Sequence, residues 1–258
     1  MMQSRTVECE RAVPGSEFPQ TEALEKLDLA GRLVGYANGT RYRVRGEFLF
    51  SDIPLAGANV LEIGCGTGAW SIWAGLHGAR QVLGIEPEAK GSSGGSLSAF
   101  RTAIQRLELG NQVDARALFL HELERSGVPF DVIVMYNVIN HLDEESVVVL
   151  DRDHNARQRY LAALRDLRSR IHPNGWIIVA DCARDNLWPR LGMTSPFAPT
   201  IEWHKHQNPA TWIDVFEQAG FRSLDLRWSP LQPLLRLTSN WFVNYLTCSH
   251  FVLRFRAV

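Results

Sequence analysis

The sequence predicts an α/β fold: a doubly wound, mostly parallel seven-stranded sheet with helices on both faces and a C-terminal antiparallel strand. Short apolar runs typical of buried strands alternate along the chain with segments of helical periodicity, which is the pattern of a parallel sheet with crossover helices. A glycine-rich turn follows the first apolar run, at 64–68. The last two apolar runs lack a usual helical crossover between them, which favours an antiparallel pair at that end.

Size and composition limit the possible classes of protein. A chain of 258 residues favours one large domain. Lys and Arg (27) nearly balance Asp and Glu (28), so no net field attracts nucleic acid, and we expect no nucleic-acid partner. The four cysteines include no Cys-x-x-Cys pair, and no apolar run reaches about 20 residues. Residues 1–20 have no apolar h-region, so we do not expect them to be a signal peptide. A reduced, cytoplasmic protein without a membrane span is expected.

Residues 1–55 predict a polar tail followed by a helical lid. A helix is expected over 21–34, with Thr21 as its N-cap. Residues 35–50 mix aromatic and basic side chains, and two interpretations stay open. They form a surface helix that packs at the sheet edge, or they cover a ligand. The second interpretation places three side chains near that ligand: Tyr36, Tyr42 and Arg43.

The central part of the chain supplies five strands and three helices. Proline cannot continue a central strand, so Pro87 places Glu86 at the carboxyl end of the second strand. A turn is expected at 172–175, before the fifth strand. The strands are expected at 60–63, 81–85, 111–118, 130–136 and 176–180. The helices are expected at 69–77, 96–109 and 144–170, the last with a break near 151–155.

The C-terminal part carries two irregular insertions. Residues 181–207 lack periodicity, and a long irregular segment within a compact domain is usually functional. A helix follows at 209–219, with Asn208 as its N-cap. The last two strands are expected at 224–228 and 249–255, separated by an apolar and aromatic insertion at 229–247.

The glycine turn indicates a small-ligand site. Glycines at positions 64, 66 and 68 allow left-handed backbone and a close approach of another molecule. In a doubly wound sheet, ligands bind beyond the carboxyl ends of the strands. Glu86 lies 22 positions after Gly64, where a carboxylate can accept hydrogen bonds from both ribose hydroxyls. A nicotinamide enzyme satisfies the same pattern, because Gly64, Gly66 and Ala69 fit a loose G-x-G-x-x-A match.

Three motifs in order favour another class. Glu62 precedes the first glycine by two residues, in E-x-G-x-G-x-G, and both 130–142 and 167–181 match strand motifs. Together these motifs resemble those of the class I S-adenosylmethionine-dependent methyltransferases. The resemblance implies a methyltransferase domain at 56–258, S-adenosylmethionine as cofactor and a small-molecule substrate.

The resemblance also implies which residues bind the cofactor. The glycines would contact the methionine and ribose portions, Glu86 the ribose and Asn137 the methionine portion. Glu62 would hold the turn and lie near the amino group, and a purely structural role for this acid stays open. The acid that the family often places after the third strand is missing, so Leu118 and Phe119 would flank the adenine. The residues that the match assigns to the cofactor are Glu62, Gly64, Cys65, Gly66, Gly68, Glu86, Pro87, Leu118, Phe119 and Asn137.

Methyl transfer to a hydroxyl also requires a base, and histidine titrates in the right range. His141 follows the fourth strand closely and either acts as this base or orders its loop. His204 and His206 lie in the 181–207 insertion, and Asp181 could orient a histidine. These four residues show no helical His-x-x-x-His spacing, so no metal site is predicted.

The insertions at 181–207 and 229–247 are expected to cover the substrate. The second could instead form a homodimer surface. Three functions stay open: methyl transfer by in-line SN2 to a hydroxyl or carboxyl oxygen, an NAD(P)-dependent oxidoreductase, and a non-catalytic S-adenosylmethionine-binding protein.

Overall fold

The structure is a computed structural model that describes residues 17–88, 94–124, 127–229 and 239–258. Its centre is a seven-stranded sheet in the order β3-β2-β1-β4-β5-β7-β6, in which β7 runs antiparallel to both of its neighbours. The predicted doubly wound sheet with a C-terminal antiparallel strand is therefore confirmed. The strands are β1 (Asn59–Ile63), β2 (Gln81–Ile85), β3 (Val113–Arg116), β4 (Phe130–Tyr136), β5 (Ile171–Cys182), β6 (Phe221–Trp228) and β7 (His250–Ala257).

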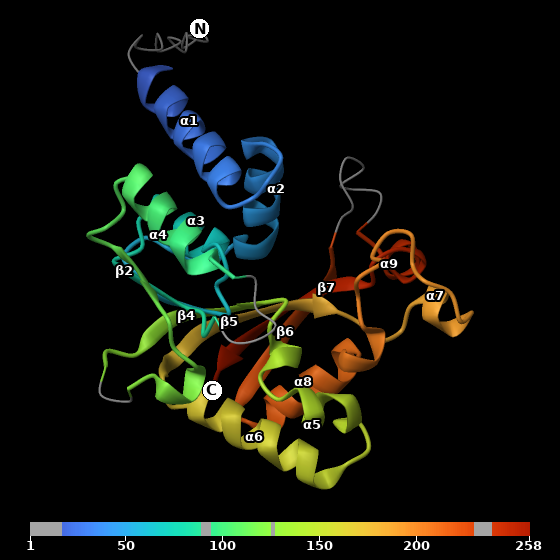
Figure 1. Ribbon diagram of the computed structural model, residues 1–258. Coiled ribbons are helices and arrows are strands. Elements are labelled where there is room, and N and C mark those ends of the chain that lie inside the picture. Colours follow the sequence, from blue (N-terminus) through green and yellow to red (C-terminus); the bar gives the residue numbers. More distant parts are fainter. Residues whose placement is uncertain (1–16, 89–93, 125–126, 230–238) are drawn as a thin grey trace, which may run out of the picture.

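Helices cover both faces of the sheet (Figure 1). One face carries α1 (Glu17–Leu33), α2 (Gly39–Phe50), α3 (Ala69–Leu76) and α4 (Ser96–Arg106). The other carries α5 (Glu144–Val149), α6 (His154–Arg168) and α8 (Pro209–Gln218). Two short helices, α7 (Leu187–Arg190) and α9 (Trp241–Leu246), lie beside each other near the start of β7.

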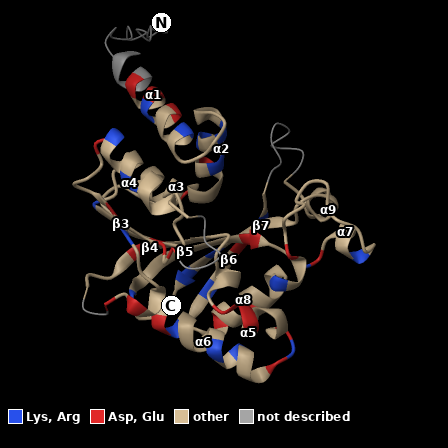
Figure 2. Cartoon of the chain, viewed as in Figure 1, with Lys and Arg blue, Asp and Glu red and all other residues tan. Residues whose placement is uncertain are grey.

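Each face has its own apolar core. Under α1 to α4, Trp70 and Tyr42 are almost fully buried and stack, with ring centroids 6.0 Å apart. On the other face, Phe216 of α8 stacks on Phe255 of β7 at 4.4 Å. Fully burying a large apolar side chain contributes roughly 1.5–3 kcal/mol, so these cores hold the strand ends in fixed positions. Figure 2 shows acidic and basic residues interspersed over the helices, with neither sign dominant in this view.

The two N-terminal helices belong to the first core. The Tyr42 hydroxyl donates to the Ala69 carbonyl at 2.6 Å, which fixes α2 against the start of α3. At the other end of α2, Arg254 Nη1 of β7 donates to the Ser51 carbonyl at 2.6 Å. Residues 35–50 therefore pack on α3 and reach β7, and Tyr42 is a core residue that faces no ligand.

Several boundaries differ from the sequence expectation. Helix α1 begins at Glu17, so Thr21 lies inside the helix and is not its N-cap. The expected turn at 172–175 lies within β5, as a bulge between the pairs Phe130–Ile171 and Val132–Trp176. A bulge interrupts the hydrogen bonding between two strands only locally, so β4 and β5 pair on both sides of these extra residues. The expected break in 144–170 is confirmed, since α5 and α6 are separate helices.

The C-terminal insertions are partly described. Residues 181–182 extend β5, and the regular structure in 183–207 consists of α7 and a single 3₁₀ turn, Trp203–Lys205. Asn208 stands at the N-cap of α8, but its side chain bonds to Asp185 instead of capping the helix. Part of the insertion at 229–247 (residues 230–238) lies outside the described residues. Across the described ranges, no helix combines the length and apolar character needed to cross a membrane.

Candidate active site

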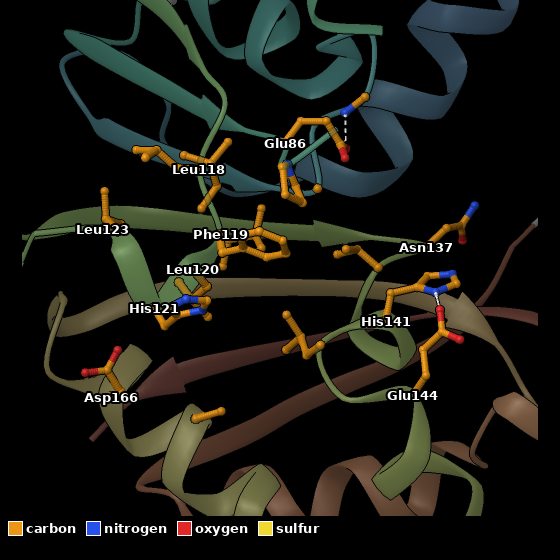
Figure 3. A pocket seen from close by; sticks show the side chains of 18 of the residues that line it. Glu86, Leu118, Phe119, Leu120, His121, Leu123, Asn137, His141, Glu144 and Asp166 are labelled. Atoms are coloured by element: carbon orange, nitrogen blue, oxygen red, sulfur yellow. Dashed lines mark hydrogen bonds and ion pairs between the residues drawn. The ribbon is translucent and has the colours of Figure 1, made fainter. Parts of the chain in front are cut away.

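A cavity of about 680 Å³ opens at the carboxyl ends of β1, β2 and β4, where the strand order reverses (Figure 3). This edge is where ligands bind in doubly wound folds. Asn137 and His141 lie at one end of the cavity, and the segment from Leu118 to Leu123 lies at the other. The lining includes Gly64, Gly66, Glu86, Pro87, Ser96, Leu118, Phe119, His121, Asn137, His141 and Glu144.

The glycine turn after β1 packs against neighbouring side chains and also exposes main chain to the cavity. Gly64, Gly66 and Gly68 all have positive φ (64°, 50° and 77°). A Cβ at Gly64 would lie 2.3 Å from Val138 Cγ2, and one at Gly68 would lie 2.1 Å from the Phe100 ring. A Cβ at Gly66 would meet nothing within 4 Å. Packing thus requires the first and third glycines, whereas the second leaves space for a ligand against the main chain.

Glu86 follows β2 and faces this turn. Its Oε2 accepts a hydrogen bond from the Gly66 backbone N–H at 3.1 Å, and Pro87 lines the cavity beside it. A carboxylate has about four acceptor positions. Glu86 therefore keeps acceptor capacity for hydroxyl donors of a ligand.

Glu62 is buried behind the turn and does not line the cavity. It accepts hydrogen bonds from the Ser71 N–H (2.7 Å), the Ser71 hydroxyl (2.6 Å) and the Trp70 N–H (3.4 Å). Burial raises the pKa of Glu62 to about 7, against these hydrogen bonds. Its carboxylate holds the first turn of α3 on β1, where the free N–H groups of a helix attract an acid.

Cys65 and Gly68 also lie outside the lining. Cys65 is buried, and desolvation raises the pKa of its thiol well above the usual range. A protonated thiol is a poor nucleophile, so Cys65 fills space in the turn.

The far end of the cavity carries the expected apolar side chains, but the lining also includes polar and charged groups that sequence reasoning missed, Ser96, His121, Asp166 and Arg170. Leu118 and Phe119 line it, and the His121 ring stacks on Phe119 at 5.4 Å. The Ser96 hydroxyl at the start of α4 is buried and has no hydrogen-bond partner in the described part of the chain. A buried hydroxyl without a partner is costly, and a ligand in the cavity would satisfy it.

Asn137 occupies the strained turn after β4, with φ 55°. Its N–H donates to the Ala180 carbonyl at 2.7 Å, and its Oδ1 accepts from His250 Nε2 at 2.9 Å. On the other side of the ring, His250 Nδ1 accepts from the Ser229 hydroxyl at 2.7 Å. Burial lowers the pKa of His250 to about 3, so the ring is neutral. Since the carbonyl of Asn137 is engaged, its NH₂ group is the one available to a ligand.

His141 ends a 3₁₀ turn, Ile139–His141, on the cavity rim. Its Nδ1 lies 2.8 Å from Glu144 Oε1, and the second oxygen of Glu144 lies 3.1 Å from Lys205 Nζ. Hydrogen bonds from His141 and then Lys205 lower the pKa of Glu144, which stays ionised. The 181–207 insertion therefore reaches the rim of the cavity through Lys205.

The structure does not bring the four predicted catalytic residues together. His206 Nδ1 lies 3.1 Å from Asp181 Oδ1, and both side chains are buried away from the cavity lining. His204 is exposed. Within the described ranges, no three His, Cys, Asp or Glu side chains are arranged to hold a metal ion.

Comparison with solved structures identifies the class of fold. A S-adenosylmethionine-dependent methyltransferase from Mesorhizobium loti superposes with a TM-score of 0.57 at 16% identity, covering 87% of this chain and 99% of that one. Magnesium protoporphyrin IX methyltransferase from Synechocystis, with bound S-adenosylhomocysteine, gives 0.56 at 16% identity over 93% and 99%. The fold is that of class I S-adenosylmethionine-dependent methyltransferases.

The sequence family agrees with the fold. The family model described as a methyltransferase domain matches residues 36–226, so the chain belongs to the methyltransferase domain family. Among curated proteins, the ubiquinone biosynthesis O-methyltransferases of Ruegeria sp. (strain TM1040) and Ruegeria pomeroyi are 26% and 27% identical over 224 residues, 80% of each chain. The predictions of a methyltransferase and of S-adenosylmethionine as cofactor are confirmed.

Proposed function

We propose that the protein transfers the methyl group of S-adenosylmethionine to an oxygen of a small-molecule acceptor, with His141 as the base. The contact between His141 and Glu144 on the cavity rim carries this proposal. The names of the relatives, which are O-methyltransferases, support an oxygen acceptor. The nicotinamide alternative is set aside because the family match favours a methyltransferase.

Two observations support cofactor binding in this cavity. The space beside Gly66 lets a ligand approach the main chain, and the buried Ser96 hydroxyl has no partner among the described residues. In this proposal Glu86 accepts from the ribose hydroxyls, Phe119 flanks the adenine and the Asn137 NH₂ group donates to the methionine portion. Gly64 and Gly68 shape the turn from behind. When bound, S-adenosylmethionine supplies a methyl group already activated on a sulfonium sulfur.

His141 has the tautomer that a base needs. An ionised carboxylate only accepts hydrogen bonds, so Nδ1 carries the hydrogen that points to Glu144, and Nε2 keeps a free lone pair. Nε2 then accepts the proton of an acceptor hydroxyl as the oxygen attacks in line. Glu144 stabilises the positive charge that forms on the ring, as carboxylates do in other His-based sites.

The other predicted residues have supporting positions in this scheme. His206 follows Lys205 in the sequence and forms a buried pair with Asp181. The His206 carbonyl also accepts from Arg184 Nε at 2.8 Å. We assign this pair to positioning the segment that carries Lys205. The homodimer contact through 229–247 stays a prediction, as does the lid at 1–55.

A labelled-methyl transfer assay against fractionated metabolite pools tests the function. His141→Ala is expected to lower kcat by ~10²–10⁴-fold with unchanged cofactor affinity, because a base contributes about that much to proton transfer. His204→Ala and His206→Ala are the matched comparisons, since either would show the large kcat loss if it were the base. Tight cofactor binding with no labelled product from any pool would instead favour a non-catalytic binding protein.

A further inference from the structure

Arg45 of α2 is a half-buried cation without a counter-ion. Its Nη1 atom is buried and has no hydrogen-bond partner, and within the described residues Arg45 takes part in no ion pair. Leaving a buried N–H of a charged group unsatisfied costs more than leaving a neutral one. Its neighbour on the same helix, Arg43, pairs with Glu47 at 3.8 Å.

Arg45 lies within electrostatic range of two tyrosines and a histidine. The Arg45 charge acts on the pKa of Tyr36, Tyr136 and His250, in each case after the larger effect of burial. Such an effect requires that the phenolic oxygens and the imidazole lie near the guanidinium. The rings also pack against one another. The ring centroids of Tyr136 and His250 are 5.4 Å apart, and the Trp70 centroid lies 5.2 Å from that of Tyr136 and 6.1 Å from that of Tyr36.

This cluster offers donors to a ligand, and the nearby acid is engaged elsewhere: Glu62 also acts on the pKa of Tyr36, but its carboxyl is buried and accepts from Ser71 and Trp70 of α3. The described part of the chain supplies no hydrogen-bond partner for the hydroxyls of Tyr36 and Tyr136, and both side chains keep some exposed surface. His250 is neutral, and both of its nitrogens are engaged, by Ser229 and Asn137. Arg45, Tyr36 and Tyr136 are therefore three partly accessible donor groups, and no described residue forms an ion pair with Arg45.

The cluster also adjoins the cofactor cavity. Asn137 lines the cavity and accepts from His250, whose ring contacts Tyr136. Tyr136 is the last residue of β4, directly before Asn137. A molecule bound at Arg45 would thus lie beside the Asn137 end of the cavity, the end that also holds His141.

We infer that Arg45 binds a carboxylate of the methyl acceptor, with the hydroxyls of Tyr36 and Tyr136 as additional donors. This inference rests on the proposed function and names the class of its substrate. The planar guanidinium matches two carboxylate oxygens, and a single cation among aromatic rings suits a monoanion better than a phosphate dianion. Tyr136, which is partly exposed, provides flat apolar surface for the body of such an acid.

Benzoate and benzamide form a matched pair of probes, because they have nearly the same shape and differ in charge. Calorimetric titration of the protein saturated with S-adenosylhomocysteine is expected to show benzoate binding at least tenfold more tightly than benzamide. Arg45→Gln should abolish this preference, and Arg43→Gln, on the same helix, should keep it.

Two results would overturn the inference: a wild-type protein that does not prefer benzoate, or an Arg45→Gln variant that still does. A melting curve of Arg45→Met separates binding from folding. Since no described residue bonds to Arg45, the Tm of this variant should equal or exceed the wild-type value, whereas loss of a structural arginine would lower it. No turnover enters the titration, so a failure to find methyl transfer would count against the proposed function alone.

Discussion

Glu62 and Glu86 lie on either side of the glycine turn and have different surroundings. Glu62 is enclosed by the N-terminus of α3, and its oxygens accept from Ser71 and Trp70. Glu86 accepts from the Gly66 N–H and faces the cavity. Two acids that look alike in the sequence motif are thus expected to differ in role, one in folding and the other in binding.

Glu86→Ala is expected to weaken S-adenosylmethionine binding by more than tenfold, because the ribose hydroxyls lose a charged acceptor. Calorimetric titration measures this affinity. Glu62→Gln is the control and should lower the melting temperature while the affinity stays near the wild-type value. Equal affinity in Glu86→Ala and the wild type would remove Glu86 from the site.

Single residues were predictable only where a motif fixed their place relative to a strand end. Asn137 and His141 follow β4 closely, and both line the cavity. Ser96 and His121 line it too, but neither belongs to a motif, and their positions depend on how α4 and the 118–123 segment pack. Conversely, Glu62 and Cys65 fit the motif, yet both are buried and neither lines the cavity.

The β1–α3 turn shows how one element serves packing and binding at once. A Cβ at its first or third glycine would overlap Val138 or Phe100, whereas a Cβ at its middle glycine would meet no described atom within 4 Å. The sequence pattern predicted the turn but not this division, because the neighbours of each glycine come from distant elements.

Gly66→Ala and Gly68→Ala should therefore separate the two roles. Gly66→Ala is expected to lose cofactor affinity with only about 1 kcal/mol of destabilisation, the cost of a side chain at positive φ. Gly68→Ala should destabilise the fold by a few kcal/mol, because its Cβ overlaps the Phe100 ring. Urea unfolding and calorimetry measure both quantities, and a Gly66→Ala variant with normal affinity would contradict the assignment of the space beside Gly66 to the cofactor.

The boundaries of helices and strands were predictable where the hydrophobic periodicity agreed with the residues that start or stop an element, such as proline and glycine. Strands β2 and β4 match their expected ranges, and Pro209 opens α8 as its position after Asn208 indicates. The 172–175 segment has the Pro-Asn-Gly composition of a turn, yet the pairing of β4 with β5 on both sides keeps it in the strand. Long-range pairing of this kind leaves no local signal.

Across the whole molecule, two buried groups couple folding to pH in opposite directions. The pKa of His250 falls from its ordinary 6.5 to about 3, so the unfolded chain binds an extra proton between these values and stability falls as pH drops below 6.5. The pKa of Glu62 rises from 4.5 to about 7, so the folded protein holds the extra proton and stability falls as pH rises through that window. Between pH 4.5 and 6.5 the two effects oppose each other.

His250→Gln removes one of these opposing groups. Relative to the wild type, the variant should gain about 2 kcal/mol of stability on going from pH 7 to pH 5, since each pH unit contributes ~1.4 kcal/mol per proton. Urea unfolding of the cofactor-free proteins at both pH values measures this difference. Parallel pH profiles for the two proteins would show that His250 does not stay neutral in the fold.

The position of β7 has a consequence for how the chain reaches this structure during synthesis. In the sheet, β6 pairs only with β7, and β7 lies between β6 and β5 although it follows both in the sequence. On the ribosome, β6 therefore emerges before the strand that can connect it to the rest of the sheet. The same late strand carries Arg254, which bonds to Ser51 at the end of α2. Both the sheet edge and the N-terminal helices must wait for β7, so nascent chains that stop before it would expose unpaired strand edges to aggregation.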